Sequence, residues 1–484
     1  MVQRSNLLKL YGLINEEEFS LNKKNQYYSK LLFSLAWLHS VLLERKRFKT
    51  QGYNVPYQFS ESDFLISYDM IVNMLDSYPE QVPFEAMQYM IGEVNYGGRI
   101  TDEIDRILVQ VLVKDLISPI QFVMPDYSVC EGLRNYIIPQ YDELEHYLEY
   151  IRALSIEDPP ELFGQSSNAD IYTQIQESKD LIYELKSFRG ANNILESEEQ
   201  LKLGEKLAFL GQSLPQALDL EAISRDSKIR GDHQLLQTVL FQEAERYNNL
   251  IVAVSKGLKN MTLVIEGSTM DYAYFISEMR ELANGQVPQS WSFAYLSDKK
   301  ILSWMRDLND RIQFINDWAK NGIPTPFWLG GLTYPSSFLS VILQKFARST
   351  GAAVDSLIWE FHVVASRFEM DESVENILPV EGVVVKGLHL VGARWDYENN
   401  CLAEALPMEL LSKMPDIYFK PVEKRKKTNS EEGFFFSCPL YVYPIRTGSR
   451  ERPSFTLFVE LPSGSMRSSH WIKRGAALLL TTSD

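Results

Sequence analysis

The residue types that could bind a metal or act as nucleophiles are scattered along this chain. The six histidines stand at positions 39, 146, 233, 362, 389 and 470, so no two have the short spacing of a metal site. The three cysteines, Cys130, Cys401 and Cys438, form no CxxC pair and are too few for a disulfide framework. We expect core or surface roles for the histidines and a reducing compartment for the thiols.

Sequence motifs that mark an active site do not occur in the 484 residues. There is no Gly-x4-Gly-Lys-Ser/Thr phosphate loop, no HExxH and no GxSxG turn that would expose a serine. The acidic pairs Glu143 with Glu145 and Glu431 with Glu432 are better explained as solvated charges than as catalytic carboxylates. We therefore predict no catalytic residue, no cofactor-binding residue and no metal ligand, and a hydrolase has only the generic presence of Ser, His and acidic residues in its favour.

Composition limits the class of protein and its partners. Forty-eight basic and 64 acidic residues give a net charge of −16, which disfavours general binding to nucleic acid or to an anionic membrane. No apolar run approaches the roughly 18 residues of a membrane span, and 45% hydrophobic residues indicate a globular protein. We expect a soluble, cytoplasmic protein of two to four domains.

The elements of the chain are arranged around residues 322–351. Pro324 and Pro326 stiffen a turn that presents Phe327 and Trp328, and an amphipathic helix begins near Pro335. Upstream of this stretch the apolar residues recur at helical spacing. Downstream they alternate as in strands, in seven short runs at 357–364, 382–390, 401–406, 416–420, 434–443, 455–461 and 476–480.

Four helices are predicted in the first 120 residues. Residues 23–48 form an amphipathic helix, Ser60 and Asp63 resemble a capping pair for the second, and a short third helix begins at Pro83 and stops at Gly92. Thr101 is placed to cap the fourth. Six more helices are expected at 140–154, 169–188, 199–213, 231–263, 270–284 and 299–320.

The predicted fold is α+β, with an all-helical bundle, then a helical layer, then a small antiparallel β-barrel or sandwich. The boundaries place the bundle at 1–125, the helical layer at 126–352 and the strands at 353–484. The charged loop at 423–432 (EKRKKTNSEE) is interpreted as a solvated insertion, with a basic docking tip as the alternative.

Several stretches resemble the extreme C-terminal part of dynein heavy chains, particularly of the axonemal type. The resemblance is carried by residues 31–63, GEVNYGGRITD at 92–102, LFGQSSNADI at 162–171, residues 318–348, GARWD at 392–396 and HWIKRG at 470–475. It implies that 1–125 is the helical lid of the sixth AAA+ module, and that 126–352 and 353–484 are the helical and β-barrel parts of the dynein C-terminal domain.

The resemblance also implies a function. The chain would be a fragment, a split gene product or an incomplete gene model of a minus-end-directed microtubule motor of cilia and flagella. It would close the AAA+ ring and couple ATPase state to movement without an active site of its own, since ATP binds elsewhere in the parent motor. The alternative is a free-standing scaffold protein that uses the same folds.

Partners and location follow from the same resemblance. The partners implied are the other AAA+ modules of the ring, and dynein intermediate and light chains through the parent complex. The microtubule would be contacted only indirectly, and neither nucleic acid nor membrane is expected. The implied location is the cytoplasm and cytoskeleton, in the axoneme of a cilium or flagellum.

Two sets of site residues are predicted. The candidate contacts to other modules are Arg99, Asp102 and Arg106; for Arg99 an ion pair with a neighbouring module is preferred to a phosphate contact. The candidate structural anchors are Trp318, Phe327, Trp328, Arg348, Arg394, Trp395 and Trp471. Arg394 is expected to hydrogen-bond across a strand pair or to pack on Trp395. Residues 441–461 depart most from the family, which leaves the strand register there open.

Overall fold

The computed structural model describes residues 2–124, 127–130, 133, 136–190, 197–230, 234–267, 272–364, 381–424, 435–447 and 454–482. His233, Glu431, Glu432 and most of the 423–432 loop lie outside these ranges. Within the ranges, no helix has the length and apolar character needed to cross a membrane. The described His, Cys, Asp and Glu residues also form no group of three that could hold a metal ion.

The N-terminal helices form one bundle, which we call the lid. Its helices are α1 (Val2–Tyr11), α2 (Glu16–Asn22), α3 (Tyr28–Glu44), α4 (Glu61–Ser77), α5 (Phe84–Tyr89), α6 (Glu103–Leu116), α7 (Ile120–Val123) and α8 (Leu144–Ala153). Helix α3 is buried on every side from Leu31 to Leu42, because α1, α4 and α6 all pack on it. The prediction of an amphipathic helix was therefore wrong in this respect: α3 is the central helix of the bundle.

The helix ends of the lid confirm one predicted cap and correct two predictions. Ser60 and Asp63 form the capping box at the start of α4, as predicted. The cap of α6 is Asp102 and not Thr101, because Asp102 Oδ1 accepts from the Ile104 and Asp105 N–H groups, both at 3.0 Å. The third helix does not stop at Gly92 but continues as a π-helix, Met90–Asn95.

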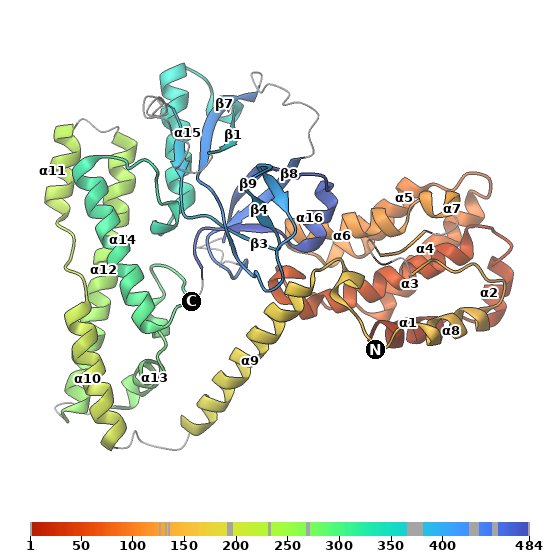
Figure 1. Cartoon of the computed structure of the whole chain (residues 1–484), viewed down its shortest axis with the longest axis horizontal. Helices are drawn as coiled ribbons and strands as arrows, with labels where there is room; N and C mark the ends of the chain where they lie inside the picture. The colour runs from red at the N-terminus through yellow and green to blue at the C-terminus, as the bar shows by residue number, and fades with distance from the viewer. Residues whose placement is uncertain are drawn as a thin grey trace.

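A second group of helices follows the lid. These are α9 (Ser167–Gly190), α10 (Ser197–Ser213), α11 (Leu220–Arg230), α12 (Gln234–Ile265), α13 (Tyr272–Ala283), α14 (Ile301–Asn321) and α15 (Pro335–Thr350). Helix α9 leads from the lid to this group, and α12 is packed by α10, α11, α14 and α15 (Figure 1). The change from helix to strand occurs between Gly351, the αL cap of α15, and Leu357.

The C-terminal residues form short strands and one helix. The strands are β1 (Leu357–Val363), β2 (Val383–Val385), β3 (His389–Val391), β4 (Arg394–Asp396), β5 (Cys401–Ala403), β6 (Ser412–Lys413), β7 (Ile417–Glu423), β8 (Phe435–Tyr441), β9 (Phe455–Pro462) and β10 (Ala477–Leu479); α16 (Ser468–Arg474) precedes β10. The run expected at 382–390 is two strands in different sheets, because the backbone turns at Gly387, whose φ is +77°.

The sheets confirm the α+β class but not a closed antiparallel barrel. The described strands form three sheets, ordered β1-β7-β2, β6-β3-β10-β8-β9 and β4-β5. Strands β8 and β10 are parallel, because α16 leads from β9 back to the far side of β8. Strands β8 and β9 are paired from Phe435 opposite Pro462 to Tyr441 opposite Phe455, which settles the register left open for that region.

The described residues form two large hydrophobic cores. The lid core runs from Leu7 to Ala169 and includes Tyr147, Ile151 and Phe163, beyond the boundary expected at 125. The second core is shared by the helices from α10 onward and by the sheets. Ile472 of α16 packs against both cores, so the last helix of the protein joins the two halves.

Candidate functional site

The turn between α14 and α15, residues 322–334, is the first of two connecting sites, and we call it the aromatic joint. The Phe327 ring is fully buried and stacks on Phe338 of α15, with ring centroids 4.1 Å apart. It meets Trp318 of α14 edge-on at 5.4 Å. The backbone of Phe327 pairs with β2, since its N–H donates to Val384 O at 2.7 Å. One residue thus holds two helices and a sheet together.

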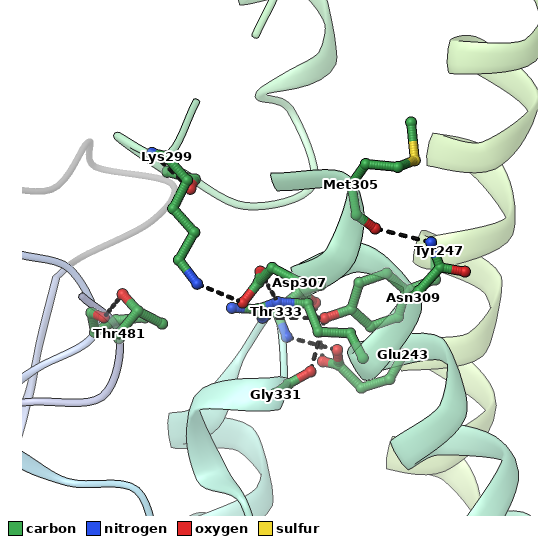
Figure 2. A network of polar contacts seen from close by, with 12 residues as sticks. Glu243, Tyr247, Lys299, Met305, Asp307, Asn309, Gly331, Thr333 and Thr481 are labelled. Carbon is green, nitrogen blue, oxygen red and sulfur yellow. Dashed lines mark hydrogen bonds and ion pairs between the residues drawn. The ribbon is translucent and has the colours of Figure 1, made fainter. Parts of the chain in front are cut away.

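A buried carboxylate of α12 holds the end of the aromatic joint. Glu243 is inaccessible to solvent and accepts three hydrogen bonds from the joint, from Thr333 N–H (2.7 Å), Thr333 Oγ1 (2.9 Å) and Tyr334 N–H (3.1 Å). Arg246 Nη1 forms an ion pair with it at 2.8 Å. Figure 2 shows Glu243 directed at Thr333. Because Tyr334 is the N-cap residue of α15, the anionic side chain of α12 satisfies the N–H of the N-cap residue and that of the residue before it.

A second buried charge pair ties α14 to the same turn. Arg311 Nε donates to Asp307 Oδ2 at 2.6 Å, and Lys299 Nζ donates to Asp307 Oδ1 at 2.9 Å. Arg311 Nη1 also donates to the Tyr247 hydroxyl at 3.3 Å. The Tyr247 hydroxyl in turn donates to Gly331 O at 2.7 Å (Figure 2). Each charge in this network therefore has an opposite charge beside it.

The counter-charges decide how the two groups titrate. Burial alone would lower the pKa of Arg311, but Tyr247 and Asp307 outweigh it and hold that pKa well above its usual value. Burial alone would raise the pKa of Asp307, and Arg311 and Lys299 outweigh it, so that pKa lies below its usual value. Both groups therefore stay charged at neutral pH.

The second connecting site, the lid junction, joins the lid to α16 and is built on Arg45. This side chain is fully buried and donates to Phe163 O, to Gly52 O at 3.3 Å and to Lys473 O at 3.0 Å. No described carboxylate forms an ion pair with it. Burial accordingly lowers the pKa of Arg45 to about 10.

Further contacts surround Arg45 in the lid junction. Gln165 Nε2 donates to Gln51 O (2.7 Å) and to Lys473 O (3.0 Å), and Arg474 Nη1 donates to Gln165 O. Lys473 forms an ion pair with Asp115 of α6 at 2.9 Å. Gly475 has a φ of +65°, and a Cβ there would collide with Gln51 O. The glycine therefore permits a close approach between the backbone after α16 and the backbone of the lid.

Two more side chains extend this contact to the strands. Asn54 Nδ2 donates to the Tyr441 hydroxyl of β8 at 2.8 Å. Asn168 Nδ2 donates to Leu406 O at 2.8 Å, and its oxygen accepts the Met408 N–H at 2.8 Å. The lid junction is therefore a set of directed hydrogen bonds that fixes the position of the lid against α16 and the sheets.

The three predicted inter-module residues lie together on the lid and have partners within it. Arg99 Nε forms an ion pair with Asp63 at 2.7 Å, while about half of the Arg99 side chain stays exposed. Asp102 caps α6 and accepts from Asn54 Nδ2 at 3.0 Å. Arg106 Nη2 donates to Ile100 O at 3.3 Å. Their contact with another module stays a prediction.

The predicted structural anchors differ in burial. Trp318, Phe327, Trp395 and Trp471 are buried, Trp328 is half-buried beneath the Arg311 guanidinium, and Arg348 is exposed at the end of α15. Arg394 Nε donates to Glu404 O at 3.1 Å, which confirms a hydrogen bond across the β4-β5 pair.

Sequence reasoning missed the buried charges. Arg45, Glu243, Asp307 and Arg311 were not singled out, although two signals were present. Glu243 stands inside the apolar stripe of α12, and Asp307 and Arg311 are four residues apart on the buried face of α14. A charged residue in the apolar stripe of a helix predicts a buried partner, but not which one.

The protein matches family models over nearly its whole length. Residues 28–169 match the AAA lid domain of the dynein heavy chain, and residues 175–480 match the C-terminal domain of the dynein heavy chain. The protein is 40% identical over 483 residues to the dynein-1-beta heavy chain, flagellar inner arm I1 complex, of Chlamydomonas reinhardtii. It is 39% identical over 482 residues to dynein axonemal heavy chain 2 of Mus musculus.

These alignments cover 99% of this chain and 10% or 11% of the two relatives. The chain thus spans about a tenth of the length of the relatives it matches. The matches favour the dynein interpretation over a free-standing scaffold. The chain therefore belongs to the dynein heavy chain family and has the AAA lid domain and the C-terminal domain of that family.

Proposed function

We propose that this chain forms the ring-closing end of an axonemal dynein heavy chain, a minus-end-directed microtubule motor of cilia and flagella. The names of its relatives, which are flagellar and axonemal heavy chains, support this assignment. The single structural observation behind the mechanical role is the lid junction. There the buried Arg45 of the lid donates to a backbone carbonyl of α16, so the two domains are held in one orientation.

The proposed role is to pass movement between the lid and the C-terminal domain. The lid junction connects the lid to α16. Helix α16 packs against the second core, which the sheets share with the helices from α10 onward. The aromatic joint then connects β2 to α14 and α15 through Phe327. A displacement of the lid would reach the helical layer through these two contacts.

The chemistry belongs to the parent motor. We propose that this chain does not hydrolyse ATP by itself and that ATP acts at modules outside it. The other AAA+ modules would pack against the lid surface at Arg99, Asp102 and Arg106. Intermediate and light chains would associate through the parent complex, and the microtubule would be reached only indirectly. The complex would work in the axoneme, within the cytoskeleton.

The test uses a parent motor that contains these 484 residues. Arg45→Met should lower microtubule gliding velocity more than it lowers ATP turnover, since it loosens the contact between lid and α16 without touching a nucleotide site. The exposed neighbour Lys46→Met is the matched control and should leave both rates unchanged. Equal velocities for the Arg45 variant and the wild type would contradict the mechanical role.

A second assay tests whether this chain hydrolyses ATP by itself. The isolated 484-residue protein, assayed with ATP and Mg²⁺, should show no turnover above buffer. Turnover that persists through further purification and disappears on a point mutation would contradict the proposal.

A further inference from the structure

A cavity of about 400 Å³ lies between the lid and the C-terminal strands, beside the lid junction. Its lid side is formed by residues 50–54 and by α6, and its other side by β8, β9 and α16. Helices α6 and α16 lie against each other at this place (Figure 1). The volume falls within the range of about 300–1,000 Å³ that holds small organic molecules in proteins.

Most of the cavity wall is apolar. Its apolar lining includes Ile104, Ile107 and Leu108 of α6 together with Phe436 of β8 and Phe458 of β9. Phe458 remains about two-fifths exposed despite its position in a strand. A wall of this kind favours an aliphatic or aromatic group, because burying such a group releases water from apolar surface.

One cation in the wall, Arg446, has no counter-charge among the described residues. Arg446 is 6% exposed, and its Nη2 donates to Gly475 O at 2.8 Å. Its guanidinium lies 5.3 Å from the centre of the Tyr441 ring. Its Nε is buried with no hydrogen-bond partner among the described residues, and no described carboxylate forms an ion pair with it. A buried cation in this state is stabilised by an anion brought by another molecule.

The acidic group of the same wall, Asp105, forms no ion pair with this cation. Both carboxylate oxygens of Asp105 accept backbone N–H groups, from Asn54 at 2.9 Å and from Val55 at 3.0 Å. These bonds hold the Asp105 carboxylate against the lid. Arg446 thus remains the group that could receive an anion from the cavity.

We propose that this cavity binds a small amphipathic carboxylate, with the carboxylate at Arg446 and the apolar part between α6 and the β8-β9 pair. A guanidinium and a carboxylate match in geometry and charge, which favours this head group. Because the walls come from both the lid and the C-terminal strands, the ligand would stabilise their contact. The proposal does not depend on the activity of the parent motor.

The test is calorimetric titration of the full 484-residue protein with decanoate, and with 1-decanol as the uncharged probe. Decanoate should bind at one site per molecule, and at least tenfold more tightly than 1-decanol. Arg446→Met should weaken decanoate at least tenfold and leave 1-decanol unchanged. The exposed arginine variant Arg348→Met is the control and should bind both probes as the wild type does.

A second variant tests the cavity without removing the charge. Ile107→Trp should fill the space and weaken both probes, whereas the exposed Ile66→Trp should weaken neither. Decanoate should also raise the thermal midpoint of the wild type and not that of Ile107→Trp. If Arg446→Met fails to fold, Ile107→Trp decides the question. Unsaturable decanoate binding, or equal binding by wild type and Ile107→Trp, would overturn the proposal.

Discussion

Two buried arginines, Arg311 at the aromatic joint and Arg45 at the lid junction, show opposite electrostatics. Both are almost inaccessible, at 2% and 0% exposure. Arg311 has the Asp307 carboxylate at 2.6 Å, and its pKa lies well above the usual value. Among the described residues Arg45 has only carbonyl oxygens as acceptors, and burial lowers its pKa to about 10. Burial is the same for both, so the presence of a counter-charge decides the direction of the shift.

The difference suggests different mechanical properties. The charge pairs of the aromatic joint lie within one core, and breaking one leaves a buried charge without compensation. At the lid junction Arg45 is bound by backbone carbonyls, so its loss removes hydrogen bonds but leaves no opposite charge stranded. We expect the aromatic joint to be the more rigid contact and the lid junction the one that can be weakened in steps.

The largest expected effect tests the charge pair of the aromatic joint. Asp307→Leu leaves Arg311 buried and unpaired, so the opening free energy of α14 should fall by about 3–5 kcal/mol. Hydrogen exchange of α14 peptides measures it. The double variant Asp307→Leu with Arg311→Met should recover most of the loss, and the exposed Asp310→Asn should stay within about 0.5 kcal/mol of the wild type. A double variant as unstable as the single one would refute the pairing argument.

The next effect tests the lid junction. Arg45→Met removes hydrogen bonds from a charged donor, each typically worth about 1.5–3 kcal/mol. It also removes the cost of burying that charge, which offsets part of the loss. We expect a loss of about 2 kcal/mol in lid stability, measured by hydrogen exchange of α3. Lys46→Met is the control. A loss as large as that of Asp307→Leu would remove the distinction between the two sites.

A pH series sharpens the comparison. Burial raises the pKa of Asp105, which lines the cavity beside the lid junction, from 3.8 to about 6, so between these values the folded protein binds more protons than the unfolded protein. Stability from this group is therefore present at low pH and is lost as pH rises through that window. The unfolding free energy of the wild type minus that of Asp105→Asn should be more positive at pH 4.5 than at pH 7, by about 2 kcal/mol.

Asp307 provides the contrast in the same titration. Its pKa is shifted below 3.8, so the stability it contributes is lost only as pH falls below that value. The gap between wild type and Asp307→Asn should therefore be the same at pH 4.5 and pH 7. Urea unfolding at the two pH values measures both differences. If the wild type becomes less stable relative to Asp105→Asn at pH 4.5 than at pH 7, the pKa of Asp105 is not raised in the folded protein.

The smallest effect concerns the predicted inter-module surface. Arg99 is half exposed, so its ion pair with Asp63 should contribute no more than about 1 kcal/mol, and Arg99→Gln should barely change the urea midpoint of the isolated protein. If Arg99 also contacts a neighbouring module, the same variant should lower ATP turnover in the parent motor. Arg348→Gln is the control for both assays, and normal turnover by the Arg99 variant would remove Arg99 from the interface.

Local patterns were sufficient to predict much of the fold. The helical period before residue 322, the alternation after residue 351 and the capping pair Ser60 and Asp63 predict elements that the structure confirms. These signals depend on residues close together in the sequence, so no knowledge of distant contacts is needed. The family resemblance was likewise readable from ordered matches along the sequence.

Other features depended on contacts between distant residues. The burial of α3 on every side, the parallel pairing of β10 with β8, and the partners of Arg45 all require segments that lie far apart in the sequence. A charged residue in an apolar stripe predicts that a partner exists. The partner of Arg311 is a carboxylate and that of Arg45 is a backbone carbonyl. Only the tertiary structure decides between these two, because sequence spacing does not specify which distant groups meet.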